Sequence, residues 1–123
     1  MEKEAIAKIV GLMMMSRDFT HLAHLRSKGA GAYAEHMALG GFYDAIVDLA
    51  DGLAEAVQGK YGILDIEIPP MKGDLEDVIG ALRTHVTMIE NLCKKCDTSW
   101  IDNMVQEVET LYYSTIYKLE NLK

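Results

Sequence analysis

Four residues that are common metal ligands are spaced along the first half of the chain. They are His24, His36, Asp51 and Glu55, separated by twelve, fifteen and four positions. Imidazole and carboxylate ligands together suit iron, zinc or manganese. Side chains four residues apart on a helix face the same way, so Asp51 and Glu55 can hold one ion together. The types and spacing of these residues therefore predict a metal site.

The segment between the two histidines predicts a tight connection between two helices. It contains Gly29, Ala30, Gly31 and Ala32 in succession. Glycine ends helices and permits reversals of the chain. We therefore expect a first helix over residues 2–27, which carries His24, and a second over residues 32–59, which carries the other three residues.

On the second expected helix, the apolar side chains gather on one face. With 100° per residue and His36 at zero, this face covers about 260° to 340°. Its members are Leu39, Tyr43, Ile46, Ala50, Leu53 and Val57. Asp51 lies near about 60° and Glu55 near about 100° on the same wheel. The two carboxylates are thus expected beside the core stripe and not within it.

The second half of the chain predicts two more helices after a long connection. Residues 59–73 include an alternating ILDIEI stretch and the pair Pro69–Pro70, and they favour a short extended segment or a crossover along the molecule. The third helix is expected from an Asp74 N-cap to Cys96, and the fourth from Trp100 to Leu122, capped by Asp97-Thr98-Ser99. The expected fold is an all-α four-helix bundle, with one domain over residues 1–123.

Composition narrows the function classes. The chain has 123 residues, half of them apolar and a quarter charged, which suits one globular domain. Its formal net charge of −7 argues against nucleic-acid binding through phosphate contacts. No stretch reaches the length of a transmembrane helix, and Glu2 and Glu4 spoil the basic start of a signal peptide. We expect a cytoplasmic protein without a disulfide framework.

The four spaced residues and the expected architecture resemble the Dps family of mini-ferritins. These are cytoplasmic four-helix proteins of the ferritin superfamily that usually assemble as hollow dodecamers. His24, His36, Asp51 and Glu55 match all four positions of the family's ligand pattern. The KGAGAYAEH segment is similar to the family's first turn, DLADGLAEAVQ to its second helix, and TIYKLENL to the end of its last helix.

The resemblance implies a homo-oligomer that binds iron across a two-fold interface. His24 and His36 would come from one subunit, and Asp51 and Glu55 from its neighbour. The implied activity is that of a ferroxidase with a role in iron storage and oxidative protection, with zinc or manganese as alternative ions. Two observations agree: the carboxylates flank the core stripe, and the chain has no Glu-x-x-His motif of the kind that intrachain di-iron sites use.

Several positions depart from the family pattern. Gly40 stands where the family usually has an aspartate, and Leu25 where it often has a tryptophan. The lysine-rich N-terminal tail of some members is absent, since the first helix is expected to start almost at Met1. The short chain is closer to the abbreviated Dps-like proteins predicted in tailed phages. The alternative is therefore a ferritin-fold binding or assembly module, possibly phage-encoded, that has lost ferroxidase activity.

The remaining polar residues have structural interpretations. Asp44 and Asp48 are expected on a solvated or interface face, with substitution for the missing carboxylate as the alternative. His21 and His85 are expected to be structural or exposed, although His21 lies close enough to His24 for a metal role. Cys93 and Cys96 lie at a helix C-terminus, where the dipole does not lower a thiol pKa, and no second pair completes a zinc site.

Overall fold

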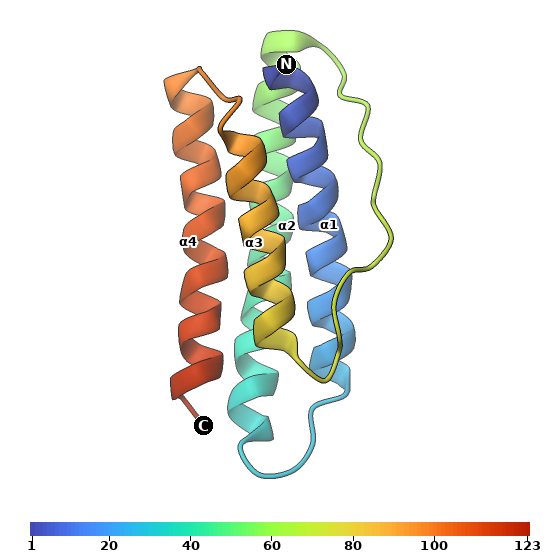
Figure 1. Ribbon diagram of the computed structural model, residues 1–123, viewed down its shortest axis with the longest axis vertical. Coiled ribbons are helices and arrows are strands. Elements are labelled where there is room, and N and C mark those ends of the chain that lie inside the picture. The colour runs from blue at the N-terminus through green and yellow to red at the C-terminus, as the bar shows by residue number, and fades with distance from the viewer.

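The computed structural model describes all 123 residues and contains four α-helices without a strand. The helices are α1 (Glu2–Leu25), α2 (Ala32–Tyr61), α3 (Val78–Cys93) and α4 (Ser99–Asn121). They lie side by side as one bundle (Figure 1). The prediction of an all-α four-helix bundle is confirmed. None of the helices is both long and apolar enough to cross a membrane.

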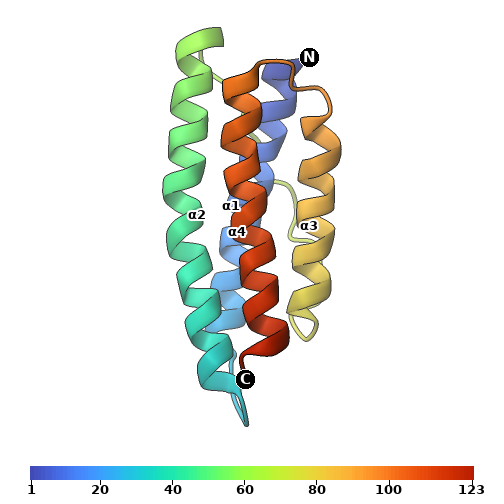
Figure 2. The ribbon, with the colours of Figure 1, turned by 90° about the vertical axis from the view of Figure 1, so that its left-hand side faces the viewer.

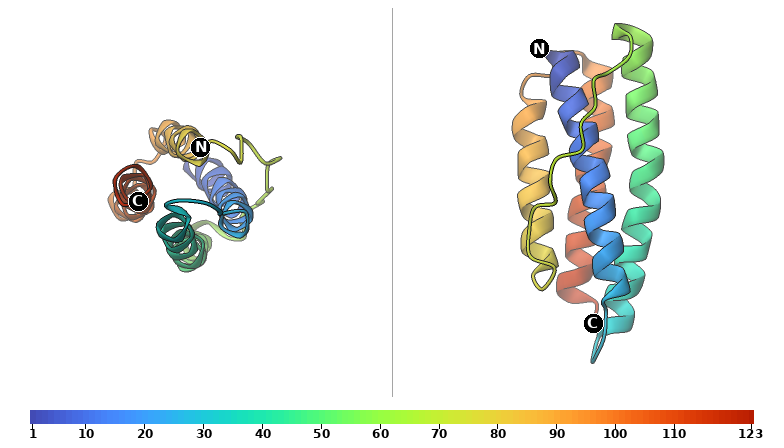
Figure 3. Two further views of the ribbon diagram at one scale, coloured as in Figure 1. Left: turned by 90° about the horizontal axis from the view of Figure 1, so that it is seen from below. Right: turned by 90° about the vertical axis from the view of Figure 1, so that its right-hand side faces the viewer.

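Each helix packs against two neighbours. The contacting pairs are α1–α2, α2–α4, α4–α3 and α3–α1, while the diagonal pairs do not meet. Seen from the end, the four helices occupy the corners of a square (Figure 3, left), and the side view in Figure 2 shows α4 running down between α2 and α3. All four contacting pairs run antiparallel (Figure 1).

The apolar faces of the helices meet in one continuous core of 27 buried residues. The predicted core position of Tyr43 is wrong, and Leu22, which also follows helical apolar spacing, lies outside the core. Leu22 is 43% exposed because Phe19 and Ala23, one helical turn apart, take the inward positions of α1. Tyr43 is half-buried between α1 and α2, and its neighbour Phe42 occupies the core instead.

The turn between α1 and α2 agrees with the prediction from its small residues. Gly29 and Gly31 have φ values of 91° and 79°. This left-handed conformation is accessible to glycine at little cost and strains most other residues. The turn ends at Ala32, where α2 begins as expected, whereas α1 ends at Leu25, two residues earlier than predicted. His24 and His36 are thereby placed at the same end of the bundle.

Residues 62–77, here called the strap, connect α2 to α3. The strap runs along α1 from one end of the bundle to the other (Figure 3, right). Its Leu64 is buried and its Ile66 packs against the core, while the carbonyl of Glu67 lies so close to Gly11 that no side chain fits there. The strap therefore packs backbone to backbone against the middle of α1.

The predicted start of α3 at Asp74 is wrong by one turn. The Asp74 carboxylate accepts a hydrogen bond from the Glu76 amide at 2.9 Å, which closes a local turn. The helix begins at Val78, and the Asp77 carboxylate caps it by accepting from the Gly80 amide at 3.0 Å. Both aspartates are suitable caps, but Asp74 closes a turn within the strap and Asp77 caps the helix.

At the opposite end of the bundle, the Glu2 carboxylate joins three segments. It is 5% exposed and accepts hydrogen bonds from the Tyr61 hydroxyl, from the Asp97 and Thr98 amides at 3.0 and 2.9 Å, and from the Thr98 hydroxyl at 2.7 Å. Burial alone would raise the pKa of Glu2, but these hydrogen bonds outweigh it and lower the pKa to about 2. Thr98, one of the three residues predicted to cap α4, is its N-cap, so Glu2 also fixes where α4 begins.

Candidate functional site

The structure brings His24 and His36 together. His24 lies in the last turn of α1 and His36 in the second turn of α2, on either side of the glycine turn. Their rings stack with centroids 3.6 Å apart and planes 20° apart. Both side chains are half-buried. Two imidazoles that are twelve positions apart in sequence thus form one compact pair.

The hydrogen bonds of the pair fix which ring nitrogen carries the hydrogen. His24 Nδ1 lies 2.7 Å from the His36 carbonyl, and His36 Nδ1 lies 3.1 Å from the His24 carbonyl. Because a carbonyl oxygen can only accept, both Nδ1 atoms must donate. In the neutral rings each Nε2 then keeps its lone pair. Metal-binding histidines usually have this arrangement, in which the second ring nitrogen donates to a backbone carbonyl or a carboxylate.

Two more rings extend the pair. His21 stacks on Tyr43 with centroids 4.3 Å apart, and Tyr43 meets His24 edge-on at 5.2 Å. We call His21, His24, His36 and Tyr43 the imidazole cluster. Tyr43 was predicted only as part of the apolar face, although its place seven residues after His36, two turns along α2, indicates that it can lie beside the histidines.

Gly40 is part of the same packing. A Cβ atom at this position would lie 3.2 Å from His24 Cε1 and 3.4 Å from His24 Nδ1, so the imidazole lies directly on the backbone of α2. A larger side chain would move the ring that donates to the His36 carbonyl. A glycine at this position is therefore matched to the position of the His24 ring.

Asp51 and Glu55 lie elsewhere on α2. Both are exposed, and neither makes an ion pair or a side-chain hydrogen bond within the chain. At 1.5 Å per residue, Asp51 is roughly 22 Å beyond His36 along the helix, and Glu55 roughly 28 Å. No group of three or more histidine, cysteine or acidic side chains in the chain is placed to hold a metal ion. A single copy of the chain therefore separates the histidine half of the predicted site from its carboxylate half.

The surroundings of Asp51 are a shallow groove between α1 and α2. The groove is also lined by Met14, Arg17 and Asp18 of α1 and by Ile68 of the strap. Arg17 pairs with Asp18 at 3.6 Å and not with Asp51. Asp44 and Asp48, the alternative acidic residues on α2, are exposed as predicted. Asp51 is thus open to a group that approaches from outside the chain.

Cys93 and Cys96 are free thiols whose surroundings keep them protonated. Burial is the main cause that raises the pKa of each thiol, and the hydrogen bond from Cys93 Sγ to Asp102 at 3.2 Å raises that of Cys93 further. A protonated thiol is a poor nucleophile and a poor metal ligand. Cys93 packs against the core, as expected for a residue at a helix end, and Cys96, which was expected to be a spectator, packs there too.

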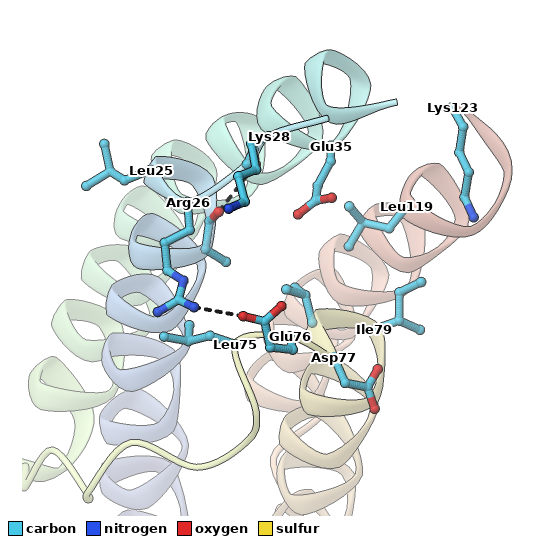
Figure 4. A pocket seen from close by; sticks show the side chains of 13 residues that line it. Leu25, Arg26, Lys28, Glu35, Leu75, Glu76, Asp77, Ile79, Leu119 and Lys123 are labelled. Carbon is cyan, nitrogen blue, oxygen red and sulfur yellow. Dashed lines mark hydrogen bonds and ion pairs between the residues drawn. The ribbon is translucent and has the colours of Figure 1, made fainter. Parts of the chain in front are cut away.

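The largest hollow of the molecule lies at the end of the bundle near the glycine turn. It has a volume of about 760 Å³ and is bordered by all four helices and by the end of the strap (Figure 4). Arg26 pairs with Glu76 across it at 2.8 Å. Basic and acidic side chains alternate around the rim, and no histidine or cysteine lines it. Its mixed charge indicates no preferred ligand.

Comparison with known proteins identifies one family. The family described as a "Family of unknown function (DUF5856)" matches residues 24–119, which are 96 of the 123 residues. The matched span begins at His24 and includes the whole imidazole cluster except His21, together with Asp51 and Glu55. No curated protein and no solved structure matches the chain.

Proposed function

The chain belongs to the DUF5856 family, whose function is unknown, and we propose that it is a cytoplasmic, Dps-like mini-ferritin. It binds Fe(II) between two copies of the chain, promotes its oxidation and holds the ferric product inside an oligomeric shell. Iron is the substrate and cargo of this protein. The physiological role is protection from the damage that free Fe(II) and peroxide cause together.

The connectivity of the bundle supports a ferritin-like fold. A strap of sixteen residues, 62–77, leads from the end of α2 to the far end of α3, so that these two helices run in the same direction (Figure 1). Ferritin-like bundles use one long crossover of this kind, whereas simple up-and-down bundles have only short turns. The core of this bundle is apolar along α2, which leaves no room for a carboxylate-rich ion site inside one chain.

The pairing of His24 and His36 is the observation that carries the proposal. Both imidazoles are held by Nδ1 donation to a backbone carbonyl, so both offer Nε2 to a ligand. Two nitrogen ligands alone leave a divalent ion without charge compensation. Two carboxylates supply it, and Asp51 and Glu55 are exposed, unpaired and one helical turn apart.

A two-fold interface would join the two halves. In such an interface, residue i of one copy meets residue j of the other, and j meets i in return. Antiparallel packing of the α1–α2 faces of two copies would bring His24 and His36 of one copy to Asp51 and Glu55 of the other. Each dimer would contain two equivalent sites. Larger shells, such as a dodecamer, would be built from these dimers.

The chemistry at this site is the removal of one electron from each Fe(II). Two Fe(II) ions reduce one hydrogen peroxide to two water molecules, consuming two protons and giving two Fe(III); dioxygen is the alternative oxidant. The chain's own contribution is to bind and orient the ion with two neutral imidazoles and two carboxylates. Zn(II) and Mn(II) accept the same ligands and would compete for the site.

Gly40 supports a second candidate function. Because the His24 ring covers this position, the site has one carboxylate fewer than the usual Dps pattern. With one negative charge fewer around the ion, the site loses more of its affinity for Fe(III) than for Fe(II). It would then bind a divalent ion without promoting its oxidation. The protein would then be a ferritin-fold binding or assembly module in which the ion stabilises the two-fold interface.

Anaerobic titration with Fe(II), followed by addition of peroxide, tests the proposal. We expect saturable binding of one Fe(II) per chain and oxidation that is faster than in buffer. A Glu107→Gln variant, which removes an exposed carboxylate on the outer face of α4, should behave as the wild type does. Binding without faster oxidation would favour the second candidate. No saturable binding would contradict both.

A further inference from the structure

One histidine provides the polar attachment of the middle part of the strap, residues 65–73. Between residues 65 and 73, the strap makes one hydrogen bond to the rest of the chain, in which the Lys72 carbonyl accepts from His85 Nε2 at 2.7 Å. None of the charged side chains of residues 65–73 forms an ion pair within the chain; the ion pair of the strap, between Glu76 and Arg26, lies beyond this part. Residues 65–73 are otherwise held by the packing of Ile66 and by two close backbone approaches, at Gly11 and at Gly73. Residues 65–73 are thus attached to the bundle by a single hydrogen bond and limited apolar packing.

His85 belongs to a fully buried chain of hydrogen bonds. The Lys72 carbonyl can only accept, so His85 Nε2 carries the hydrogen and the neutral ring has its lone pair on Nδ1. Ser16 Oγ, 2.8 Å away, must therefore donate to Nδ1, and the Tyr112 hydroxyl donates to Ser16 at 2.6 Å. The chain of donors runs from α4 through α1 to α3 and ends on the strap. His85, Ser16 and Tyr112 are essentially inaccessible to solvent.

A proton on His85 is incompatible with this arrangement. Protonated Nδ1 would have to donate to Ser16, which already accepts from Tyr112, so the hydrogen of Ser16 would lose its acceptor. No compensating charge is present on any neighbouring element. α1 presents Ser16 and the Phe19 ring, which is nearly perpendicular to the imidazole, α4 presents the neutral phenol of Tyr112, and the strap presents a carbonyl. Burial accordingly lowers the pKa of His85, only partly offset by the Lys72 carbonyl, and burial raises that of Tyr112.

The strap covers the Nε2 side of the His85 imidazole, so water cannot reach and hydrate the protonated ring from that side. Nε2 points at the Lys72 carbonyl, and the next residue, Gly73, lies directly on Phe19 and Ala81 with a φ of 115°. If the strap moves away, water reaches the imidazole and the charged form is no longer penalised. We propose that His85 is a proton-controlled latch, which holds the strap on the bundle when neutral and releases residues 65–73 when protonated in mild acid.

Release of the strap would change two grooves on the surface of the bundle, because residues of the strap line both. Ile68, four residues before Lys72, lines the groove that contains Asp51. Pro69 and Pro70 form one wall of a second groove, of about 580 Å³, whose other walls include Met88 and Leu92 of α3. A strap that leaves the bundle would thus remodel the surroundings of Asp51 and expose apolar surface between α1 and α3. The latch itself does not depend on metal binding by the chain.

The sign of the pH dependence follows from the lowered pKa. The unfolded chain has the ordinary histidine pKa near 6.5, and burial lowers the pKa of His85 in the latched state; exposure of the imidazole on release would return it toward the ordinary value. The latched state is therefore fully favoured above about pH 6.5 and loses its advantage as the pH falls from there toward the lowered value. The strap should open before the rest of the bundle unfolds, since only one hydrogen bond has to be broken.

Nuclear magnetic resonance of the metal-free protein, from about pH 7.5 to about pH 5, tests the latch across the ordinary histidine range. The His85 Cε1 resonance reports protonation, and the heteronuclear NOE of the amides of residues 65–68 and 71–73 reports mobility of the strap on the nanosecond scale. We expect the His85 titration and the loss of strap NOE to share one midpoint below pH 6.5, while amides within α2 remain rigid.

A His85→Gln variant keeps a neutral donor to Lys72 and an acceptor for Ser16, so its strap should stay ordered across the whole range. His21→Gln, which removes an imidazole that does not touch the strap, should open as the wild type does. If His85→Gln does not fold, agreement of the two midpoints in the wild type decides alone. A strap that stays rigid while His85 titrates, or that opens equally in His85→Gln, would overturn the proposal.

Discussion

Replacing His36 by alanine is expected to weaken Fe(II) binding by at least roughly 100-fold and to abolish the acceleration of oxidation. The substitution removes one Nε2 ligand. It also removes the ring that stacks on His24 at 3.6 Å and donates to the His24 carbonyl, so the remaining imidazole loses its fixed orientation. Anaerobic Fe(II) titration and the absorbance increase on oxidation measure the two effects.

His21→Ala is the matched control for this loss. His21 belongs to the same imidazole cluster but stacks on Tyr43 and shares no hydrogen bond with the pair, so we expect near wild-type affinity. Thermal unfolding of both variants separates loss of a ligand from loss of the α1–α2 turn. Unchanged affinity in a folded His36→Ala protein would rule out the histidine pair as the iron site.

Glu2→Gln is expected to lower the free energy of unfolding by about 2–3 kcal/mol at neutral pH. Glutamine has nearly the same shape, but it lacks the charge and one of the two acceptor oxygens. At least one of the donors from Tyr61, Asp97 and Thr98 then lies buried without an adequate partner. Urea denaturation measures the change. Glu4→Gln, an exposed carboxylate two positions on in the same helix, should change stability far less.

The same carboxylate should make stability depend on acid. The pKa of Glu2 is about 2 in the folded chain and 4.5 in its ordinary state. Its contribution is therefore complete above about pH 4.5 and is lost as the pH falls from 4.5 toward 2. Glu2→Gln should lack this part of the acid destabilisation, so the two proteins should differ less at pH 3 than at pH 7. A constant difference between them would show that the lowered pKa does not stabilise the fold.

The helical periodicity of the sequence was sufficient to predict most of the architecture. Regular apolar spacing and the glycine turn located four helices, and the start of α2 agrees to the residue. The errors arose where two nearby residues are equally suited to the same core position or the same helix cap. Phe42 and Tyr43 are both aromatic, and Asp74 and Asp77 are both good caps, so only the packing of α1 on α2 and of the strap on α3 decides between them.

The site could be predicted only in part for a similar reason. Spacing along one helix indicated that Asp51 and Glu55 lie beside the core stripe, and both are exposed. The stacking of His24 on His36, the fit of the ring over Gly40 and the place of Tyr43 depend on how closely α1 approaches α2, which no local pattern encodes. His85 looked like an isolated histidine because its partners come from two other helices and the strap.

The most direct test of a site shared between two copies is complementation of two inactive variants. His36→Ala and Asp51→Ala should each lack accelerated Fe(II) oxidation. When equal amounts are unfolded together and refolded, half of the dimers are mixed, and each mixed dimer regains one intact site of two. We therefore expect about a quarter of the wild-type activity to return. If the refolded mixture is as inactive as either variant alone, the proposed intersubunit site is contradicted.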